Sequence, residues 1–154
     1  ERLMLDGWLD FHRQTLLLKC AGLTPVQLKT AAVPPSSLTL LGLVRHMADV
    51  ERWWFRQRAV GEPIESRYWT KEYPDGDFDL IESADAEADF AIFEQECELA
   101  RAAVAKLPLE HTFTHPRGAE MSLRWIYVHM IEEYGRHNGH ADLIRERIDG
   151  VTGA

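Results

Sequence analysis

Four stretches of this sequence repeat apolar residues at the spacing of an α-helix, and this pattern constrains the fold more than any other feature. Gly22, Gly61 and Gly150 follow three of these stretches and suit helix ends, while Pro108 ends the remaining one. A Ser or Thr before the second stretch is expected to cap its first turn. We therefore predict an all-α fold with four long helices, over residues 2–21, from one of Ser36, Ser37 or Thr39 to about 58, 83–107 and 122–149.

The connections between these helices carry further information about topology. Residues 62–82 form a connection longer than adjacent antiparallel helices need, so the second and third helices can run in the same direction. This predicts an up-down-down-up four-helix bundle with a long crossover between helices 2 and 3. Thr24-Pro25 with Gln27 predicts a short capped helical turn. The alternating "HTFTH" followed by "PRGA", within residues 108–121, suits a small hairpin or an irregular loop.

Length and composition fit one globular domain that spans residues 1–154. Hydrophobic residues make up 45% of the chain, and no repeat or linker divides it. On the first helix, five residues are expected to face the core: Leu5, Trp8, Leu9, Leu16 and Cys20. Cys97 lies at helical spacing from Phe90, Phe93 and Val104 and is expected to be a core thiol.

Charge and apolar runs limit the partners of the chain. A net charge of -8 argues against a nucleic acid, whose phosphates must be neutralised by Lys and Arg. Apolar runs such as residues 38–44 are too short to cross a bilayer, so no membrane partner is expected, and no signal peptide is visible. Two cysteines make a poor disulfide framework for a domain of this size. We expect a cytoplasmic protein.

The fourth predicted helix carries unusual chemistry on its apolar side. His129, Glu133, His137 and His140 fall within an arc of roughly 80°, which Ile126 and Ile144 share. A carboxylate on an inward face is costly unless it is paired or binds a metal. Glu133 and His137 are one turn apart, so their side chains face the same point.

The second predicted helix offers a partner for this pair. His46 lies between Leu43 and Val50 on the apolar face, so its imidazole must hydrogen-bond within the core or bind a ligand. Each histidine alone is most simply a satisfied core residue, as we expect for His12 beside Trp8 and Leu16. Together, an inward His facing an inward Glu-x-x-x-His is the geometry of a metal site inside a helix bundle.

The segments "LTLLGLVRHMADVERWWF" and "WIYVHMIEEYGRHNGHADLIRERIDG", with the opening "ERLMLDGWLDFHRQTLL", resemble the DinB-like (YfiT-like) superfamily of metalloproteins. The resemblance covers essentially the whole chain and lies near the mycothiol-dependent maleylpyruvate isomerase branch. It implies an up-down-down-up bundle, frequently a homodimer, and one divalent metal ion. In that superfamily the ion is held by one histidine of the second helix and a histidine pair on the last.

The resemblance assigns residues position by position. His46 and His137 correspond to metal ligands, and Glu133 stands where the common pattern has histidine. A similar Glu-x-x-x-His arrangement occurs in the maleylpyruvate isomerase branch, so Glu133 is expected as the third ligand. His140 replaces a glutamine of many members, and His129 matches a family histidine that is not expected to be a ligand.

Two histidines and one carboxylate leave coordination positions open, as in catalytic sites. Zinc or nickel is expected, and iron, cobalt or manganese also suit this donor set. The resemblance implies activation of a low-molecular-weight thiol of the mycothiol type for transfer or isomerisation of a small-molecule substrate. His140 is the candidate proton shuttle or a structural neighbour of the ligands.

Several aromatic and basic residues leave two interpretations open. Trp53 and Trp54 are expected in the core or an interface. Five others could line the entrance to the metal site and bind an anionic substrate, or serve only in packing: Tyr68, Trp69, Tyr73, Arg117 and Arg124. Two other function classes stay open, a non-catalytic metal-binding stress or sensor protein and a structural dimer without metal.

Overall fold

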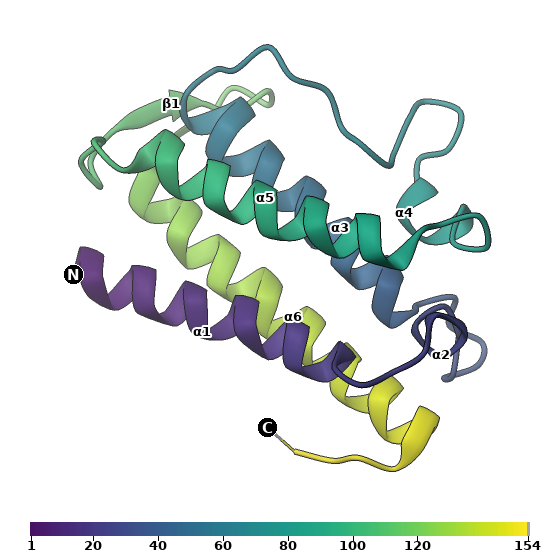
Figure 1. Cartoon of the computed structure of the whole chain (residues 1–154). Coiled ribbons are helices and arrows are strands. Elements are labelled where there is room, and N and C mark those ends of the chain that lie inside the picture. Colours follow the sequence, from purple (N-terminus) through teal and green to yellow (C-terminus); the bar gives the residue numbers. More distant parts are fainter. Residues whose placement is uncertain (154) are drawn as a thin grey trace.

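The computed structural model describes residues 1–153 of the chain and is mostly helical (Figure 1). One small antiparallel hairpin accompanies the helices, with Phe113 paired to Met121. The all-α prediction therefore holds except for this hairpin, which lies where "HTFTH" suggested one. The elements are α1 (Arg2–Cys20), α2 (Pro25–Leu28), α3 (Leu40–Glu51), the π-helix η1 (Arg52–Ala59), α4 (Gly76–Asp79), α5 (Ala86–Val104), β1 (Thr112–Thr114), β2 (Glu120–Ser122) and α6 (Leu123–Asp149).

Capping residues explain several helix boundaries. The Thr39 side chain accepts a hydrogen bond from the Gly42 amide and caps α3, so Thr39 is the cap among the three candidates. Gly150, with φ of 80°, ends α6 in the left-handed conformation. The helix expected over residues 83–107 is shorter at both ends, since α5 ends at Val104 and begins after Asp85. The Asp85 side chain accepts from the amides of Glu87 and Ala88 and so determines this start.

Two pairs of long helices form the body of the protein. Figure 1 shows α1 beside α6 and α3 beside α5, and these are the most extensive contacts between helices. The long connection between η1 and α5 carries the short helix α4, which packs against α3. The core between the pairs contains fully buried side chains from all four long helices, including Leu9, Leu16, Met47, Phe93 and Ile126.

The second predicted helix continues to Ala59, but its last part is a π-helix rather than an α-helix. Within η1, Arg52 and Arg56 donate to the two oxygens of Glu96 at 2.8 and 2.7 Å. These ion pairs hold η1 against α5. A π-helix is rare and frequently borders a functional site.

Trp8 was expected in the core, and this prediction is wrong, since the residue is 53% exposed. The buried face of α1 is made by Leu5, Leu9, Leu16 and Cys20, and Trp8 lies beside that stripe. Cys97 is buried as predicted, and both Cys20 and Cys97 are free thiols.

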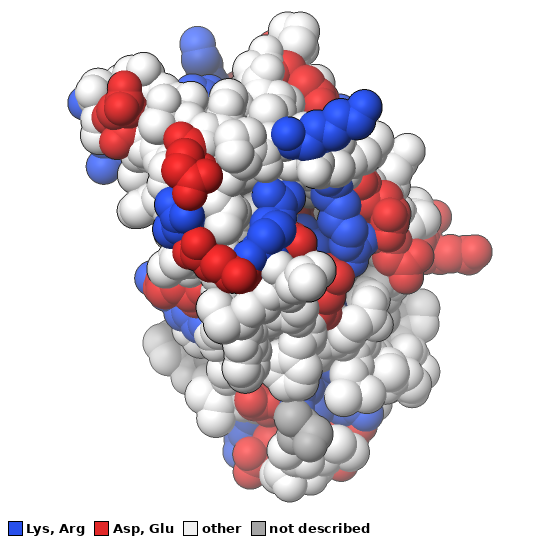
Figure 2. All heavy atoms as spheres, turned by 90° about the vertical axis from the view of Figure 1, so that its left-hand side faces the viewer, with Lys and Arg blue, Asp and Glu red and all other residues white. Residues whose placement is uncertain are grey.

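None of the helices in residues 1–153 is long and apolar enough to cross a membrane. Figure 2 views the end of the molecule that lies at the left of Figure 1. Basic and acidic side chains alternate across the middle of this face. The face therefore carries no continuous basic surface of the kind that holds a phosphate backbone.

Candidate metal centre

The structure brings His46 of α3 together with Glu133 and His137 of α6. One nitrogen or oxygen from each of these residues lies within 4.8 Å of the others. The imidazoles of His46 and His137 have centroids 4.8 Å apart, and Glu133 Oε2 lies 3.4 Å from His137 Nε2. All three side chains are half-buried, so they could hold one ion and leave one side open.

Local structure explains why α6 presents this pair inward. Glu133 and His137 are separated by one helical turn and share their side of α6 with Ile126 and Ile144, which are buried. Tyr134, the neighbour of Glu133, is completely buried and donates a hydrogen bond to Glu51 at the end of α3. This bond fixes the rotation of α6 relative to α3.

The carboxylate of Glu133 is poorly satisfied. Its other oxygen, Oε1, lies 3.6 Å from His129 Nε2 and 4.0 Å from Arg136 Nη1, and no hydrogen bond to this side chain forms within residues 1–153. Only 17% of the side chain is exposed to water. A partly buried anion without close partners is costly, and a bound cation would remove that cost.

Asp77 contacts one of the candidate ligands and was not predicted from the sequence. Its Oδ2 lies 2.8 Å from His46 Nδ1, so the imidazole is held with Nε2 free. Carboxylates commonly orient metal-binding histidines in this way. Asp77 lies on α4, 31 residues from His46, and only the folding of the long connection onto α3 reveals the contact.

Gly76 allows α4 to approach closely enough for this contact. A Cβ atom at Gly76 would lie 2.3 Å from the Tyr68 carbonyl oxygen, so only glycine fits. The Gly76 carbonyl also accepts a hydrogen bond from Arg45 of α3. The "DGD" of the long connection is the one sequence signal that could have pointed to Asp77.

His137 is neutral at neutral pH. Burial, reinforced by the neighbouring His46 and His140, lowers the pKa of His137 to about 4. A neutral imidazole keeps its nitrogen lone pair available to a metal ion. His140 Nδ1 lies 3.3 Å from His137 Nδ1, so His140 touches a predicted ligand on the side away from Glu133.

Two further histidines considered in the sequence, His129 and His12, lie outside the cluster. His129 stacks on Trp125 and packs edge-on against Trp54, and burial lowers its pKa. His129 also lies near Glu132 and Glu133, so these three could form a second, weaker donor group. His12 accepts contacts from Asn138 between α1 and α6, as expected of a satisfied residue.

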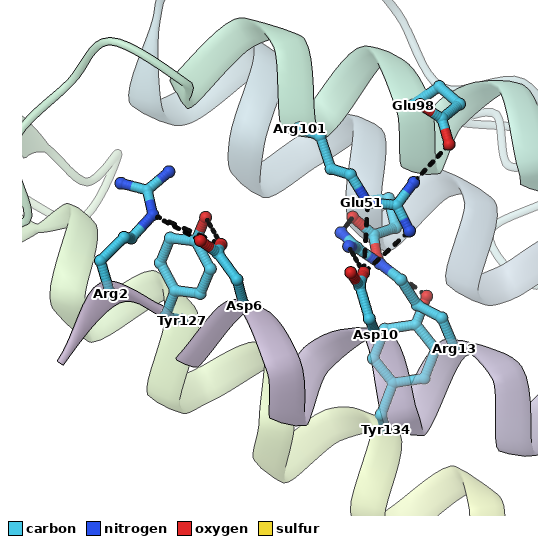
Figure 3. Close-up of polar contacts among 9 residues, drawn as sticks. All are labelled: Arg2, Asp6, Asp10, Arg13, Glu51, Glu98, Arg101, Tyr127 and Tyr134. Atoms are coloured by element: carbon cyan, nitrogen blue, oxygen red, sulfur yellow. Dashed lines mark hydrogen bonds and ion pairs between the residues drawn. The ribbon is translucent and has the colours of Figure 1, made fainter. Parts of the chain in front are cut away.

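A small cavity of about 200 Å³ opens beside His46. Its wall includes Trp53, Trp54 and Trp69. A larger hollow of about 630 Å³ lies away from the cluster, between α1 and the end of α5. Figure 3 shows charged side chains of this hollow paired with each other, Arg2 with Asp6 and Arg101 with Asp10. The smaller cavity is therefore the candidate substrate site.

Of the residues predicted to line the entrance to the site, some line the cavity and others do not. Trp53, Trp54 and Trp69 all line the cavity, and Trp54 also packs against the core, as expected. Tyr68 is buried and donates to Asp89, so it serves packing. Arg124 is paired with Glu1 and Glu110. Tyr73 and Arg117 are exposed and do not line the cavity.

Comparison with known proteins agrees with this geometry. The model of the mycothiol-S-transferase family matches residues 4–150, which is nearly the whole chain. Searches among curated proteins and among solved structures gave no match. The match confirms the resemblance to the DinB-like (YfiT-like) metal-binding superfamily. On this evidence from sequence, supported by a His/Glu cluster of the expected kind, the chain belongs to the mycothiol-S-transferase family.

Proposed function

We propose that this chain is a metal-dependent enzyme that transfers mycothiol to a small electrophile, with His46, Glu133 and His137 as the metal ligands. The observation that supports it most directly is the unsatisfied Glu133 carboxylate beside a neutral His137. A divalent ion at such a site, when bound, favours the thiolate form of a thiol. The two-nitrogen, one-oxygen donor set suits zinc or nickel, and also iron, cobalt or manganese.

Each residue of the chain has a distinct part in this proposal. His46 and His137 supply nitrogen donors, and Glu133 supplies a negative charge that offsets the dication. Asp77 holds His46 in the required orientation. His140, next to His137, is the candidate acceptor of the thiol proton, which then passes to solvent.

The tryptophan-lined cavity is the candidate acceptor site. It adjoins His46, so an electrophile bound there would lie next to the activated sulfur. In the reaction, the thiolate sulfur would form a bond to an electrophilic carbon. In a substitution the leaving group departs with the electron pair of the broken bond and takes up a proton, and in an addition to a double bond the resulting carbanion takes up the proton. The family match favours this transfer over the isomerisation that the sequence left open.

The proposal includes the setting of the enzyme. We propose that residues 1–154 form one domain, that the four long helices form an up-down-down-up bundle, and that the protein works in the cytoplasm. The two buried free thiols suit a reducing compartment.

Two measurements test the proposal. Protein purified without a chelator and reconstituted with zinc or nickel should bind one tightly held ion per chain and should conjugate mycothiol to a fluorogenic electrophile. Loss of conjugation with a chelator, and its return with metal, would support the enzyme. An ion bound without any turnover would favour the non-catalytic metal-binding alternative. A protein that binds no divalent ion would favour the structural alternative.

A further inference from the structure

The tryptophan-lined cavity is both aromatic and acidic. Its lining residues are His46, Asp49, Val50, Trp53, Trp54 and Trp69. Three indole rings and one carboxylate thus border about 200 Å³ of space, and no lysine or arginine of residues 1–153 belongs to this wall. The rings of Trp53 and Trp69 meet at 62° with centroids 6.4 Å apart, so they form a corner rather than a parallel slot.

Asp49 differs from the other carboxylates that are buried within residues 1–153. Ion pairs with Arg or His offset the charge of these others, which are Glu51, Asp77, Asp89 and Glu96. Asp49 is only 6% exposed, has no such pair in this part of the chain, and accepts hydrogen bonds only from the connection between η1 and α5. The donors are Ser66 Oγ, the Arg67 amide at 2.8 Å and the Tyr68 amide at 3.0 Å. A buried charge without a counter-charge is costly, and a cation in the adjoining cavity would lower that cost.

The arginines nearest to Asp49 in sequence do not supply this counter-charge. Arg52, one turn further along the helix, donates to Glu96 instead. Arg58 lies over the Trp53 ring, 4.1 Å from its centroid, and is not among the residues that line the cavity. The contact between Arg58 and Trp53 is a cation–π interaction, so one indole of the wall already attracts a cation within the folded chain.

Asp49 also helps to position one of the aromatic walls. Ser66 Oγ, which donates to Asp49, accepts a hydrogen bond from the Trp69 amide at 3.3 Å. Trp69 is 42% exposed and lies in a connection without regular structure, so this link to a buried residue of α3 fixes its place. The negative charge and the outermost aromatic ring therefore belong to one hydrogen-bonded arrangement.

We propose that this cavity binds a quaternary ammonium group of the acceptor substrate, with the indole rings at its sides and Asp49 as the opposite charge. Aromatic rings attract such a cation through their π-faces, most strongly where the cation is desolvated. A quaternary ammonium has no N–H to donate, so it suits a carboxylate whose oxygens already accept hydrogen bonds. The inference rests on the proposed function, because the electrophilic carbon of the same molecule would extend past His46 toward the thiol.

The same walls disfavour an anionic acceptor. An anion would enter a space bordered by a carboxylate and by the negative faces of aromatic rings, with no basic side chain in the lining to bind it. Arg117 and Arg124, which the sequence suggested for an anionic substrate, do not line the cavity. The net charge of -8 also attracts cations rather than anions to the protein.

Calorimetric titration tests the binding step without any turnover. The two probes are choline and its neutral isostere, in which a tert-butyl group replaces the trimethylammonium. Wild type should bind choline roughly tenfold or more tightly than the isostere. Trp69→Leu and Asp49→Asn should each remove most of this preference, the first by loss of a π-face and the second by loss of the charge. Trp8→Leu, which removes an exposed tryptophan outside the cavity, is the matched control and should keep the preference.

A matched pair of electrophiles extends the test to the reaction. Bromoacetylcholine and its tert-butyl isostere have the same reactive carbon. With either ester the sulfur of mycothiol bonds to that carbon, bromide leaves with the electron pair of the broken bond, and the thiol proton passes to solvent. The KM of the cationic ester should be roughly tenfold lower at similar kcat. Trp69→Leu should raise the KM of the cationic ester and leave that of the neutral ester nearly unchanged.

Two results would overturn the inference. Choline that binds wild type no more tightly than the isostere would show that the cavity does not select a cation. A preference that persists in both Trp69→Leu and Asp49→Asn would place the bound cation elsewhere. The proposed function fails in a different way: selective binding of choline without any conjugation would reject the transferase and keep the cation site. Conjugation that favours the neutral ester would keep the transferase and reject the cation site.

Discussion

Two inward carboxylates of this protein, Glu51 and Glu133, meet very different surroundings. Glu51 is completely buried, receives two hydrogen bonds of 2.7 Å from Arg13, and receives a third from Tyr134 at 2.8 Å. Figure 3 shows this group between α1, α3 and α6, with Asp10 and Arg101 beside it. Glu133, next to Tyr134 on the same helix, has contacts no shorter than 3.4 Å. One carboxylate is fully satisfied by the chain, and the other is not.

This difference separates a structural group from a candidate binding group. The Glu51 cluster joins α1, α3 and α6 and leaves no place for a ligand atom, because its oxygens are already occupied. Glu133 has oxygens free in a site where two imidazoles converge. The Glu51 cluster also helps to position Glu133, since the hydrogen bond from Tyr134 to Glu51 fixes the orientation of α6, the helix that carries Glu133.

The largest expected effect comes from breaking the satisfied cluster. Arg13→Ala leaves Glu51 as an uncompensated buried charge, so the free energy of unfolding should fall by about 3–5 kcal/mol. Chemical denaturation of the apo protein measures this change. Arg136→Ala is the matched control, because Arg136 is exposed, pairs with the exposed Glu132 and only borders Glu133; it should change stability by less than about 0.5 kcal/mol. If both variants lost the same free energy of unfolding, Arg13 would not be the residue that makes buried Glu51 stabilising.

The next effect comes from the unsatisfied carboxylate. Glu133→Gln keeps the shape of the side chain and removes its charge, so the affinity for zinc or nickel should fall by roughly 100-fold or more. The apo protein should stay folded and should be at least as stable as wild type, because a costly partly buried anion is lost. Metal titration and melting temperature, with and without chelator, measure the two results. Unchanged metal affinity would show that Glu133 is not a ligand.

The sequence predicted what depends on neighbouring residues and missed what depends on distant ones. The Ser122 and Gly150 boundaries of α6 follow from local hydrogen bonds and backbone conformation, and the inward stripe of α6 follows from helical periodicity. The same periodicity placed His46, Glu133 and His137 on the inward faces of their two helices. The π-form of η1 was not predictable from this pattern, because its apolar spacing was interpreted with an α-helical period.

The wrong prediction for Trp8 and the unpredicted contact of Asp77 each have a specific physical cause. Trp8 was placed in the core by its apolar character, yet its position on α1 lies beside the buried stripe rather than within it. Asp77 was overlooked because its role depends on how a connection of irregular structure folds back onto α3, and neither composition nor spacing predicts that path. The sequence thus predicted the candidate ligands but not the residue that orients one of them.

A smaller effect should follow from that orienting residue. Asp77→Asn keeps a side-chain oxygen near His46 Nδ1 but removes the charge, so metal affinity should fall by about 10- to 100-fold. Metal titration against wild type measures the loss. Asp79→Asn, on the same short helix, is the matched control and should bind metal as wild type does. Equal losses in both variants would attribute the effect to α4 as a whole.

The smallest effect concerns a third carboxylate, Glu96, which belongs to the satisfied kind. Burial alone would raise the pKa of Glu96, but hydrogen bonds from Arg67 and Arg56 hold it below its usual value of 4.5. A lowered pKa in the folded state means that the stabilisation is complete above pH 4.5 and is lost as the pH falls through the folded pKa. Because all three arginine partners are partly exposed, the loss should be on the order of 1 kcal/mol.

Chemical denaturation of wild type and Glu96→Gln, from neutral pH down to the lowest pH at which the protein stays folded, measures the stabilisation by ionised Glu96. The variant should lose stability less steeply below pH 4.5, since it has no charge to lose at this position. Glu98→Gln is the matched control, because the Glu98 side chain is 76% exposed and bonds only Arg101; its acid slope should equal that of wild type. A Glu96→Gln slope as steep as wild type would mean that the arginines do not hold Glu96 ionised, and this carboxylate would then resemble Glu133 rather than Glu51.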